Sequence, residues 1–317
     1  MGQTSDNQRT EKTMPSSKDL EIAGILTRDK NEQGLERLAI NTDSASAELY
    51  LQGAHLAQWQ PQGQRPVLFL SRRSSFVPGK AIRGGIPIIF PWFGARTTNA
   101  LSQRSDGPSH GFARTALWQL SAATQCGDTV NLTLSLEAND ATRNLGFADF
   151  TLTYELAIGA ELSLKLTTRN NSTRPIHIEE AFHSYFQVGD VRQIAVCGLE
   201  ECDYLDKTDA LRRKRQSEAV LRLSAETDRP YLNTKQTVSI DDPLYKRRIA
   251  VAKENSSTTV VWNPWSESAK LADMEPGGWT EMVCIEAANA LENAIVIEPG
   301  ASHTMSTTIS VQNLPVS

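Results

Sequence analysis

Alternation of apolar and polar residues is the dominant pattern in the middle of the chain. In VNLTLSL, residues 130–136, every second side chain is apolar, and a period of two places these side chains on one face of a strand. The runs at residues 150–159 and 161–170 repeat the pattern, and Gly159 lies where a hairpin connection is needed. The three runs predict an antiparallel meander.

Strand patterns continue toward the C-terminus, whereas helical periodicity is scarce. The segments TTVVWNPW and HTMSTTISVQNL are rich in the β-branched and aromatic residues that pack well on a pleated surface. The best helical candidate, residues 209–223, places a few apolar residues among many charges and predicts a solvated surface segment or a short helix. No repeat or low-complexity linker lies between residues 22 and 314. We therefore predict an all-β fold, with residues 21–317 forming one large antiparallel β domain.

The composition narrows the class of protein. Of the 317 residues, 39% are hydrophobic and 22% are charged, which is typical of a globular chain. The net charge of −5 argues against a general nucleic-acid binder, which needs a basic surface. No segment reaches the ~18 consecutive apolar residues that a membrane-spanning helix requires. We expect neither nucleic acid nor membrane as a partner, and any anionic ligand must meet a local basic cluster.

The N-terminus and the cysteines suggest the compartment. Residues 1–20 are polar and mixed in charge, without the apolar core of a secretory signal, and predict a disordered tail. The four cysteines follow no metal-binding spacing and are expected to be free thiols, as in a reducing compartment. We expect a cytoplasmic protein that acts as a monomer.

The most unusual local sequence is KAIRGGIPIIFPWFGAR, residues 80–96. Glycine lets a ligand approach the main chain and proline fixes φ, so Arg83 could present a preorganised guanidinium to an anion. The alternative is a buried bulge or turn in which the glycines only solve a steric problem.

A second basic segment, SHGFAR at residues 109–114, contains His110 and Arg114 just before a predicted strand. Arg114 could join Arg83 in holding a phosphate, or it could make a structural ion pair.

Two titratable residues lie in apolar surroundings. His183 follows IEEAF, and its ordinary pKa of about 6.5 makes it a candidate general acid. The alternative is a core histidine bonded to a backbone carbonyl. Glu286 follows the apolar run at residues 282–285, where an unpaired carboxylate would cost several kcal/mol unless it binds a ligand or a partner base. Alternatively, Glu286 is solvated at the end of a strand.

Other motifs point to no further chemistry. His55, His177 and His303 have no carboxylate companion or helical metal spacing, so we predict no metal site. The chain also lacks the GxSxG, GxxxxGK[ST] and GxGxxG patterns of common hydrolases, nucleotide sites and dinucleotide sites.

Six segments, taken in order, resemble the glucose-6-phosphate 1-epimerase (hexose-6-phosphate mutarotase) family of the aldose 1-epimerase-like group. They are RGGIP, HGFAR, FHSYF, DYLDK, WNPW and MVCIEAAN, and the resemblance covers residues 22–313. It implies a large β-sandwich of the galactose-mutarotase type that uses no metal or organic cofactor. It also implies an isomerase that exchanges the α and β anomers of a small-molecule sugar phosphate.

The resemblance also assigns residues. It implies that His183 and Glu286 form the catalytic pair, that Arg83 and Arg114 surround the phosphate, and that Asp206 of DYLDK contacts sugar hydroxyls. His110 and Ser109 join the expected substrate-binding set, although Ser109 stands where the family often has glutamine.

Two other functions fit the same segments. One is an aldose 1-epimerase for unphosphorylated sugars, and the other is a non-catalytic sugar-phosphate-binding protein on the same fold. The sequence FHSYFQ differs from the run that follows the catalytic histidine in galactose mutarotases, and together with Arg83 this favours a phosphorylated sugar.

Overall fold

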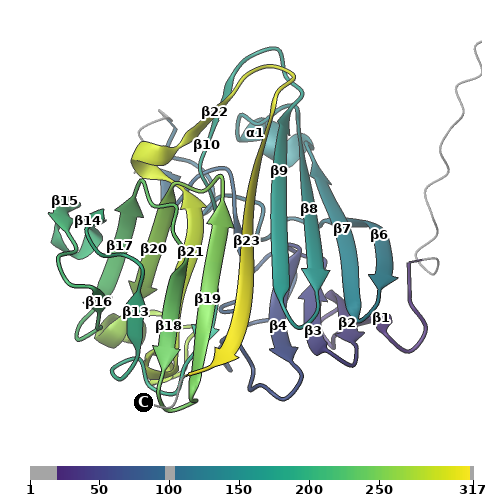
Figure 1. Ribbon diagram of the computed structural model, residues 1–317. Helices are drawn as coiled ribbons and strands as arrows, with labels where there is room; N and C mark the ends of the chain where they lie inside the picture. The colour runs from purple at the N-terminus through teal and green to yellow at the C-terminus, as the bar shows by residue number, and fades with distance from the viewer. Residues whose placement is uncertain (1–19, 97–103, 315–317) are drawn as a thin grey trace, which may run out of the picture.

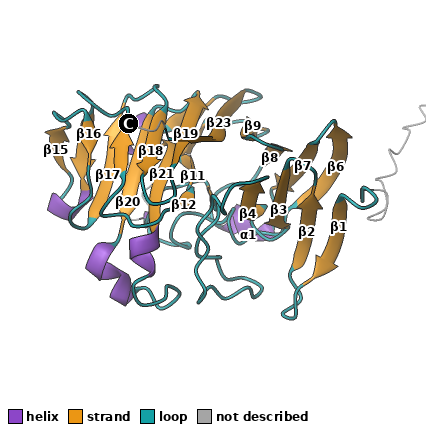
Figure 2. Ribbon diagram, turned by 60° about the horizontal axis from the view of Figure 1, so that its bottom comes forward, coloured by secondary structure: helices purple, strands orange, loops and turns teal. Residues whose placement is uncertain are grey.

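The computed structural model describes residues 20–96 and 104–314. Strands dominate these residues, and short helical turns gather mainly beside one half of the molecule (Figure 2). The predicted tail, except for Leu20, lies outside the described residues. No helix in the described part of the chain has the length and apolar character needed to cross a membrane.

The longest described sheet contains the predicted meander (Figure 1). Its strands, in spatial order, are β16 (Val220–Leu221), β13 (Ala195–Cys197), β18 (Val238–Asp242), β19 (Arg247–Glu254), β23 (Ser302–Asn313), β9 (Leu162–Asn170), β8 (Phe150–Ile158), β7 (Thr129–Glu137) and β6 (Gln119–Cys126). Strands β7, β8 and β9 pair in antiparallel order, and Gly159 lies in the turn between β8 and β9. The meander prediction is confirmed.

Two further sheets lie behind this one (Figure 1). The first has the order β1 (Leu26–Lys30), β2 (Glu36–Asn41), β3 (Ala45–Tyr50) and β4 (His55–Pro61). The second has the order β15 (Arg212–Arg215), β14 (Asp203–Asp206), β17 (Thr227–Leu232), β20 (Thr258–Asn263), β21 (Met282–Asn289), β11 (Glu180–Phe182) and β5 (Ile88–Ile89), with β12 (Tyr185–Gln187) also paired to β21. A small ribbon joins β10 (Ile176–Ile178) to β22 (Ile295–Ile297).

Alternating burial explains how the layers adhere. Every second residue of β8 is buried, and these side chains join one continuous apolar cluster with residues of all three large sheets, such as Leu49, Leu152 and Ile285. The apolar surface removed from water between the layers is the main favourable contribution to folding. The predicted antiparallel β-sandwich is therefore confirmed.

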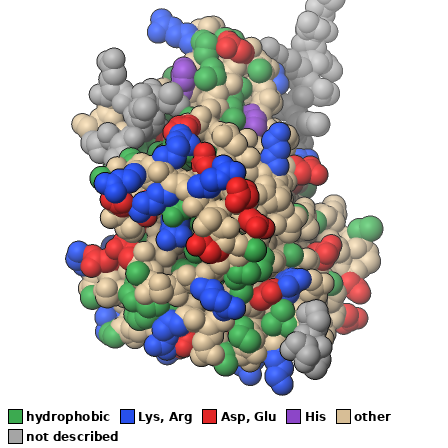
Figure 3. All heavy atoms as spheres, turned by 60° about the vertical axis from the view of Figure 1, so that its left-hand side comes forward, with side chains coloured by type: hydrophobic (Ala, Val, Ile, Leu, Met, Phe, Trp, Pro, Cys, Tyr) green, Lys and Arg blue, Asp and Glu red, His purple; other side chains and the backbone are tan. Residues whose placement is uncertain are grey.

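The helical elements are short. They are α1 (Asp140–Asn144) and the 3-10 turns η2 (Lys207–Asp209), η3 (Trp265–Lys270), η4 (Gly278–Glu281) and η5 (Leu291–Asn293). Residues 209–223 form no helix beyond the end of η2; they contain β15 and β16, so a helix there was the wrong alternative. The basic side chains of β15 instead form surface ion pairs such as Arg213–Glu292 and Arg215–Glu201. Figure 3 shows such acidic and basic side chains side by side on this face.

Candidate active site

Strand pairing brings His183 and Glu286 together although they are 103 positions apart. Phe182 of β11 pairs with Ala287 of β21, and Tyr185 of β12 pairs with Cys284, so the short connection that carries His183 lies beside Glu286. The His183 N–H donates to the carbonyl oxygen of Pro87 at 3.0 Å.

The two side chains form a buried pair. His183 Nδ1 lies 3.2 Å from Glu286 Oε1, with side-chain exposures of 8% and 1%. The alignment does not make a hydrogen bond, since His183 Nδ1 and Glu286 Oε2 have no hydrogen-bond partner in the described structure. Buried polar atoms are nearly always satisfied, so these two neighbouring unpartnered atoms on different segments make the pair a candidate ligand site.

Burial shifts the pKa values of both groups toward their neutral forms. Burial lowers the pKa of His183 well below its ordinary value, and the nearby His110 and Arg114 act in the same direction. Burial raises the pKa of Glu286 well above its ordinary value, and the charge of Asp228 adds to the effect. Removing a charge from water disfavours the charged form, and this explains both directions. Burial therefore favours neutral His183 and protonated Glu286 at this place, which we call the groove.

Aromatic rings fix the orientation of His183. Its ring stacks on Tyr185 with centroids 4.6 Å apart and meets Trp262 edge-on at 5.9 Å. His110 lies on another side, with its ring centroid 5.5 Å from that of His183. His110 Nδ1 accepts from the N–H of Gly94, and burial lowers the pKa of His110 to about 3.

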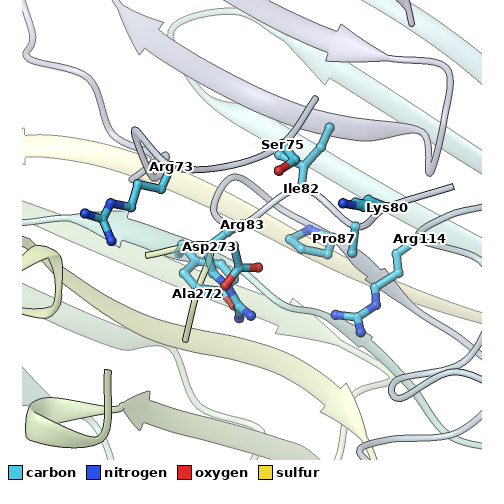
Figure 4. A pocket seen from close by; sticks show the side chains of 11 residues that line it. Arg73, Ser75, Lys80, Ile82, Arg83, Pro87, Arg114, Ala272 and Asp273 are labelled. Carbon is cyan, nitrogen blue, oxygen red and sulfur yellow. The ribbon is translucent and has the colours of Figure 1, made fainter. Parts of the chain in front are cut away.

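A basic pocket of about 430 Å³ adjoins this pair. Its polar lining comes from side chains on several loops and strands, including Arg73, Lys80, Arg83, Arg114, Tyr185 and Asp273. Figure 4 shows Arg83 and Asp273 near the centre, with Arg73 on one side and Arg114 on the other. Tyr185 lines the pocket and also stacks on His183, so the pocket and the buried pair share a wall.

Both predicted arginines are held in place. Arg83 donates from Nε to Asp273 Oδ1 at 3.2 Å and from a terminal nitrogen to the Tyr185 hydroxyl at 3.0 Å. Arg114 donates to the carbonyl oxygen of Ser109 at 2.7 Å. Ser109 itself is exposed, and its main chain rather than its hydroxyl makes this contact.

Glycines in the two basic motifs allow main-chain segments to approach closely. A Cβ on Gly85 would lie 2.4 Å from the Leu56 carbonyl oxygen, and one on Gly111 would lie 1.9 Å from the Phe90 carbonyl oxygen. Both glycines also have positive φ, at 61° and 72°. The glycines of the RGG segment therefore do solve a steric problem, and Arg83 in the same turn lines the pocket.

Asp206 is buried at the end of β14. Its carboxylate accepts from the Thr208 hydroxyl at 2.6 Å and from Lys214 Nζ at 2.7 Å. The next residue, Lys207, pairs with Asp228 at 2.7 Å. Both Lys207 and Asp228 influence the pKa of Glu286, so they belong to its surroundings.

Sequence reasoning missed several residues at the site. Asp228 pairs with Trp262, and Trp262 pairs with Cys284, so strand register places these side chains on the face that carries Glu286. Tyr185 was visible in FHSYF, but its contact with Arg83 depends on the fold. Asp228 stands in no apolar run, and no local pattern marks it.

Three side chains at the site could also hold a metal. Ligand atoms of His183, Cys284 and Glu286 all lie within 4.8 Å of one another, and all three residues are buried. The search for metal spacing along the sequence could not find this cluster, because it is built across strands.

Solved structures identify the fold. A galactose mutarotase-like protein from Clostridium acetobutylicum matches with a TM-score of 0.72 at 13% identity, covering 91% of this chain and 98% of that one. A second structure, titled "putative mutarotase (YeaD)" from Salmonella typhimurium, matches with a TM-score of 0.85 at 31% identity, covering 93% and 96%. The protein thus has the fold of the mutarotase-like class.

Sequence comparison gives the family. The model for aldose 1-epimerase matches residues 36–310. An Escherichia coli K12 protein named "Putative glucose-6-phosphate 1-epimerase" is 32% identical over 89% of this chain and 92% of its own length. The chain belongs to the aldose 1-epimerase family, and this confirms the resemblance and the prediction of a mutarotase-type isomerase.

Proposed function

We propose that this protein interconverts the α and β anomers of hexose 6-phosphates such as glucose 6-phosphate. The observation that carries the proposal is the shared wall at Tyr185, which joins a basic pocket to the buried pair His183 and Glu286. A sugar lying across this wall would place its anomeric end at the pair and its phosphate in the pocket. The name of the Escherichia coli relative supports the same substrate.

In the proposed mechanism, the carboxylate of Glu286 removes the proton from the C1 hydroxyl while protonated His183 donates to the ring oxygen. The bond between C1 and the ring oxygen breaks, its electron pair stays on that oxygen, and C1 becomes an aldehyde. Rotation about the bond between C1 and C2 exposes the other face. On closure His183 takes the hydroxyl proton, the oxygen attacks C1, and Glu286 returns its proton to the carbonyl oxygen.

This sequence requires one proton to reach His183 before ring opening. The protein favours that proton on Glu286, because burial opposes charge on both groups. His183 Nδ1 and Glu286 Oε1 lie 3.2 Å apart, so proton transfer between them requires only a reorientation that brings the two atoms into hydrogen-bonding alignment. Each positioned group is expected to contribute about 10²- to 10⁴-fold.

The remaining binding roles follow from position. We propose Arg83 and Arg114 as the phosphate ligands, with His110 beside the acid–base pair and Ser109 holding Arg114 through its carbonyl oxygen. Asp206, together with the neighbouring Asp228, would face the sugar hydroxyls.

The four cysteines are free, which supports a reducing, cytoplasmic location, and we propose that the protein acts there as a monomer.

The phosphate role is tested with Arg83→Ala. Loss of a charged hydrogen bond of about 1.5–3 kcal/mol should raise KM for glucose 6-phosphate roughly 10- to 100-fold, with little change for glucose. Arg248→Ala is the matched control, since Arg248 of β19 forms an ion pair with Asp241 of β18, on the sheet that contains the meander. Equal effects of Arg83→Ala on the two sugars would remove the phosphate role. A wild-type enzyme that prefers glucose would instead favour the free-sugar epimerase.

A further inference from the structure

The groove contains a mixed set of metal-binding atoms that the proposed reaction does not use as a set. Cys284 and Glu286 are two positions apart on β21, so their side chains share one face of the strand. His183 approaches from the connection between β11 and β12. The three ligand atoms lie within 4.8 Å of one another.

Two atoms of this set lack partners. His183 Nδ1 and Glu286 Oε2 are buried and make no hydrogen bond in the described structure. An unsatisfied buried polar atom is costly, so a ligand that satisfies both atoms would bind favourably. A sugar hydroxyl can bond these two atoms, whereas a thiol attracts a soft cation far better than it attracts a sugar.

One pair of ligand atoms has nearly the spacing of a small tetrahedral site, and all three lie within 4.8 Å of one another. Zinc bonds of about 2.0–2.3 Å to nitrogen, oxygen and sulfur place neighbouring tetrahedral ligands about 3.3–3.6 Å apart. The observed 3.2 Å between His183 Nδ1 and Glu286 Oε1 is close to that spacing. A neutral imidazole, a thiolate and a carboxylate would balance a divalent charge in this buried place. Mg²⁺ and Ca²⁺ prefer sets made only of oxygen atoms.

We propose that this groove binds one thiophilic divalent cation of the Zn²⁺ type through His183, Cys284 and Glu286. The ion would occupy the same nitrogen and carboxylate that the anomer exchange needs, so bound zinc and the reacting sugar exclude one another. Zinc is then a reversible inhibitor of the enzyme. The inhibition rests on the proposed function, whereas the binding does not.

Direct binding is tested with Co²⁺ added to the full-length, metal-free protein. We expect one equivalent to give the visible bands of tetrahedral cobalt together with a sulfur-to-cobalt charge-transfer band. Both signals should persist in Cys126→Ala, because that cysteine is exposed and lies outside the groove. The charge-transfer band should be lost in Cys284→Ala and in Cys284→Ser. The serine side chain is nearly isosteric with cysteine, so this second variant tests the ligand if the alanine variant folds poorly. An unchanged spectrum in either Cys284 variant, or no charge-transfer band in the wild type, would overturn the proposal.

Inhibition is then measured by anomer exchange of glucose 6-phosphate with and without Zn²⁺, relative to the rate of each variant in EDTA. We expect EDTA-reversible inhibition of the wild type and Cys126→Ala, and its loss in Cys284→Ala. Equal inhibition of the Cys284 variant would contradict the assigned ligands. A protein that binds Co²⁺ through Cys284 but has no exchange activity would retain the metal site and disprove the proposed function instead.

Discussion

Strands β8 and β21 differ in how their two faces are buried and in which side chains are buried there. The residues of β8 alternate between buried and half-buried, and its buried side chains are apolar or aromatic. All eight residues of β21 are buried, and among them are Cys284, Glu286 and Asn289. The second face of β21 is covered by groove side chains such as Tyr185 and Trp262. Strand β8 shows how the fold is stabilised, and β21 shows where it carries buried polar groups.

The two buried polar groups of β21 also differ from each other. The Asn289 amide donates to Glu180 Oε1 at 3.0 Å and to the carbonyl oxygen of Asn255 at 2.8 Å. Glu286 has an unpartnered oxygen. The satisfied Asn289 amide has a structural role, whereas the unpartnered oxygen of Glu286 lies beside the equally unpartnered Nδ1 of His183.

The largest expected change in the rate of anomer exchange comes from replacing the carboxylate of Glu286 on β21 by an amide. The same replacement on β8 is the control. Glu286→Gln should slow anomer exchange by about 10²- to 10⁴-fold, because the base is lost while the shape is kept. Its thermal midpoint should be unchanged or higher, since a neutral amide is easier to bury. Glu155→Gln on β8 is the control, because Glu155 is a half-exposed partner of Lys165. A Glu155→Gln variant that also lost exchange activity would contradict the difference in role between β21 and β8.

A substitution that removes apolar volume from β8 should have the opposite result, a loss of stability without a loss of activity. Leu152 is fully buried, so Leu152→Ala should lower the free energy of unfolding by about 2–5 kcal/mol. The neighbouring Thr153 faces the other side, and Thr153→Ala should stay within about 0.5 kcal/mol of the wild type. Denaturant titration measures both, and exchange rates well below the transition should be close to wild type. A large loss of activity in folded Leu152→Ala would contradict the division of roles.

The smallest expected effect is a pH dependence of stability that comes from His55, a buried histidine beneath the RGGIP loop. Burial lowers the pKa of His55 from 6.5 to about 3. Between these values the unfolded chain binds a proton that the folded protein does not, so stability falls as pH falls through this window. The slope from this group is at most about 1.4 kcal/mol per pH unit. It should be absent in His55→Gln and unchanged in the exposed control His177→Gln, as measured by denaturant titrations between pH 6.5 and 4.5. An equal slope in all three proteins would exclude His55 as its source.

Much of the fold could be predicted from local pattern. Period-two alternation located β7, β8 and β9, because one face of each strand is buried and the other is partly exposed to solvent. The segment at residues 209–223 defeated this approach, since β15 and β16 have mixed exposure with no apolar repeat to distinguish strand from helix. Short edge strands are defined by their pairing partners more than by their own residues.

The site could be predicted only in part. His183 and Glu286 were identifiable because each interrupts an apolar run, but their meeting depends on the pairing of β11 and β12 with β21. That pairing joins distant segments and leaves no local trace. Asp228 and Lys207 lie in polar surroundings along the chain, so nothing distinguished them from solvated surface residues.

The central claim is that His183 and Glu286 act as one acid–base pair. Exchange NMR of the glucose 6-phosphate anomers tests it most directly, with His183→Asn, Glu286→Gln and the double variant compared at equal concentration. Because the two groups share one proton transfer, we predict that each single variant loses nearly all the acceleration and that the double variant is no slower. Wild-type exchange in either single variant, or rate losses that multiply in the double variant, would contradict the account.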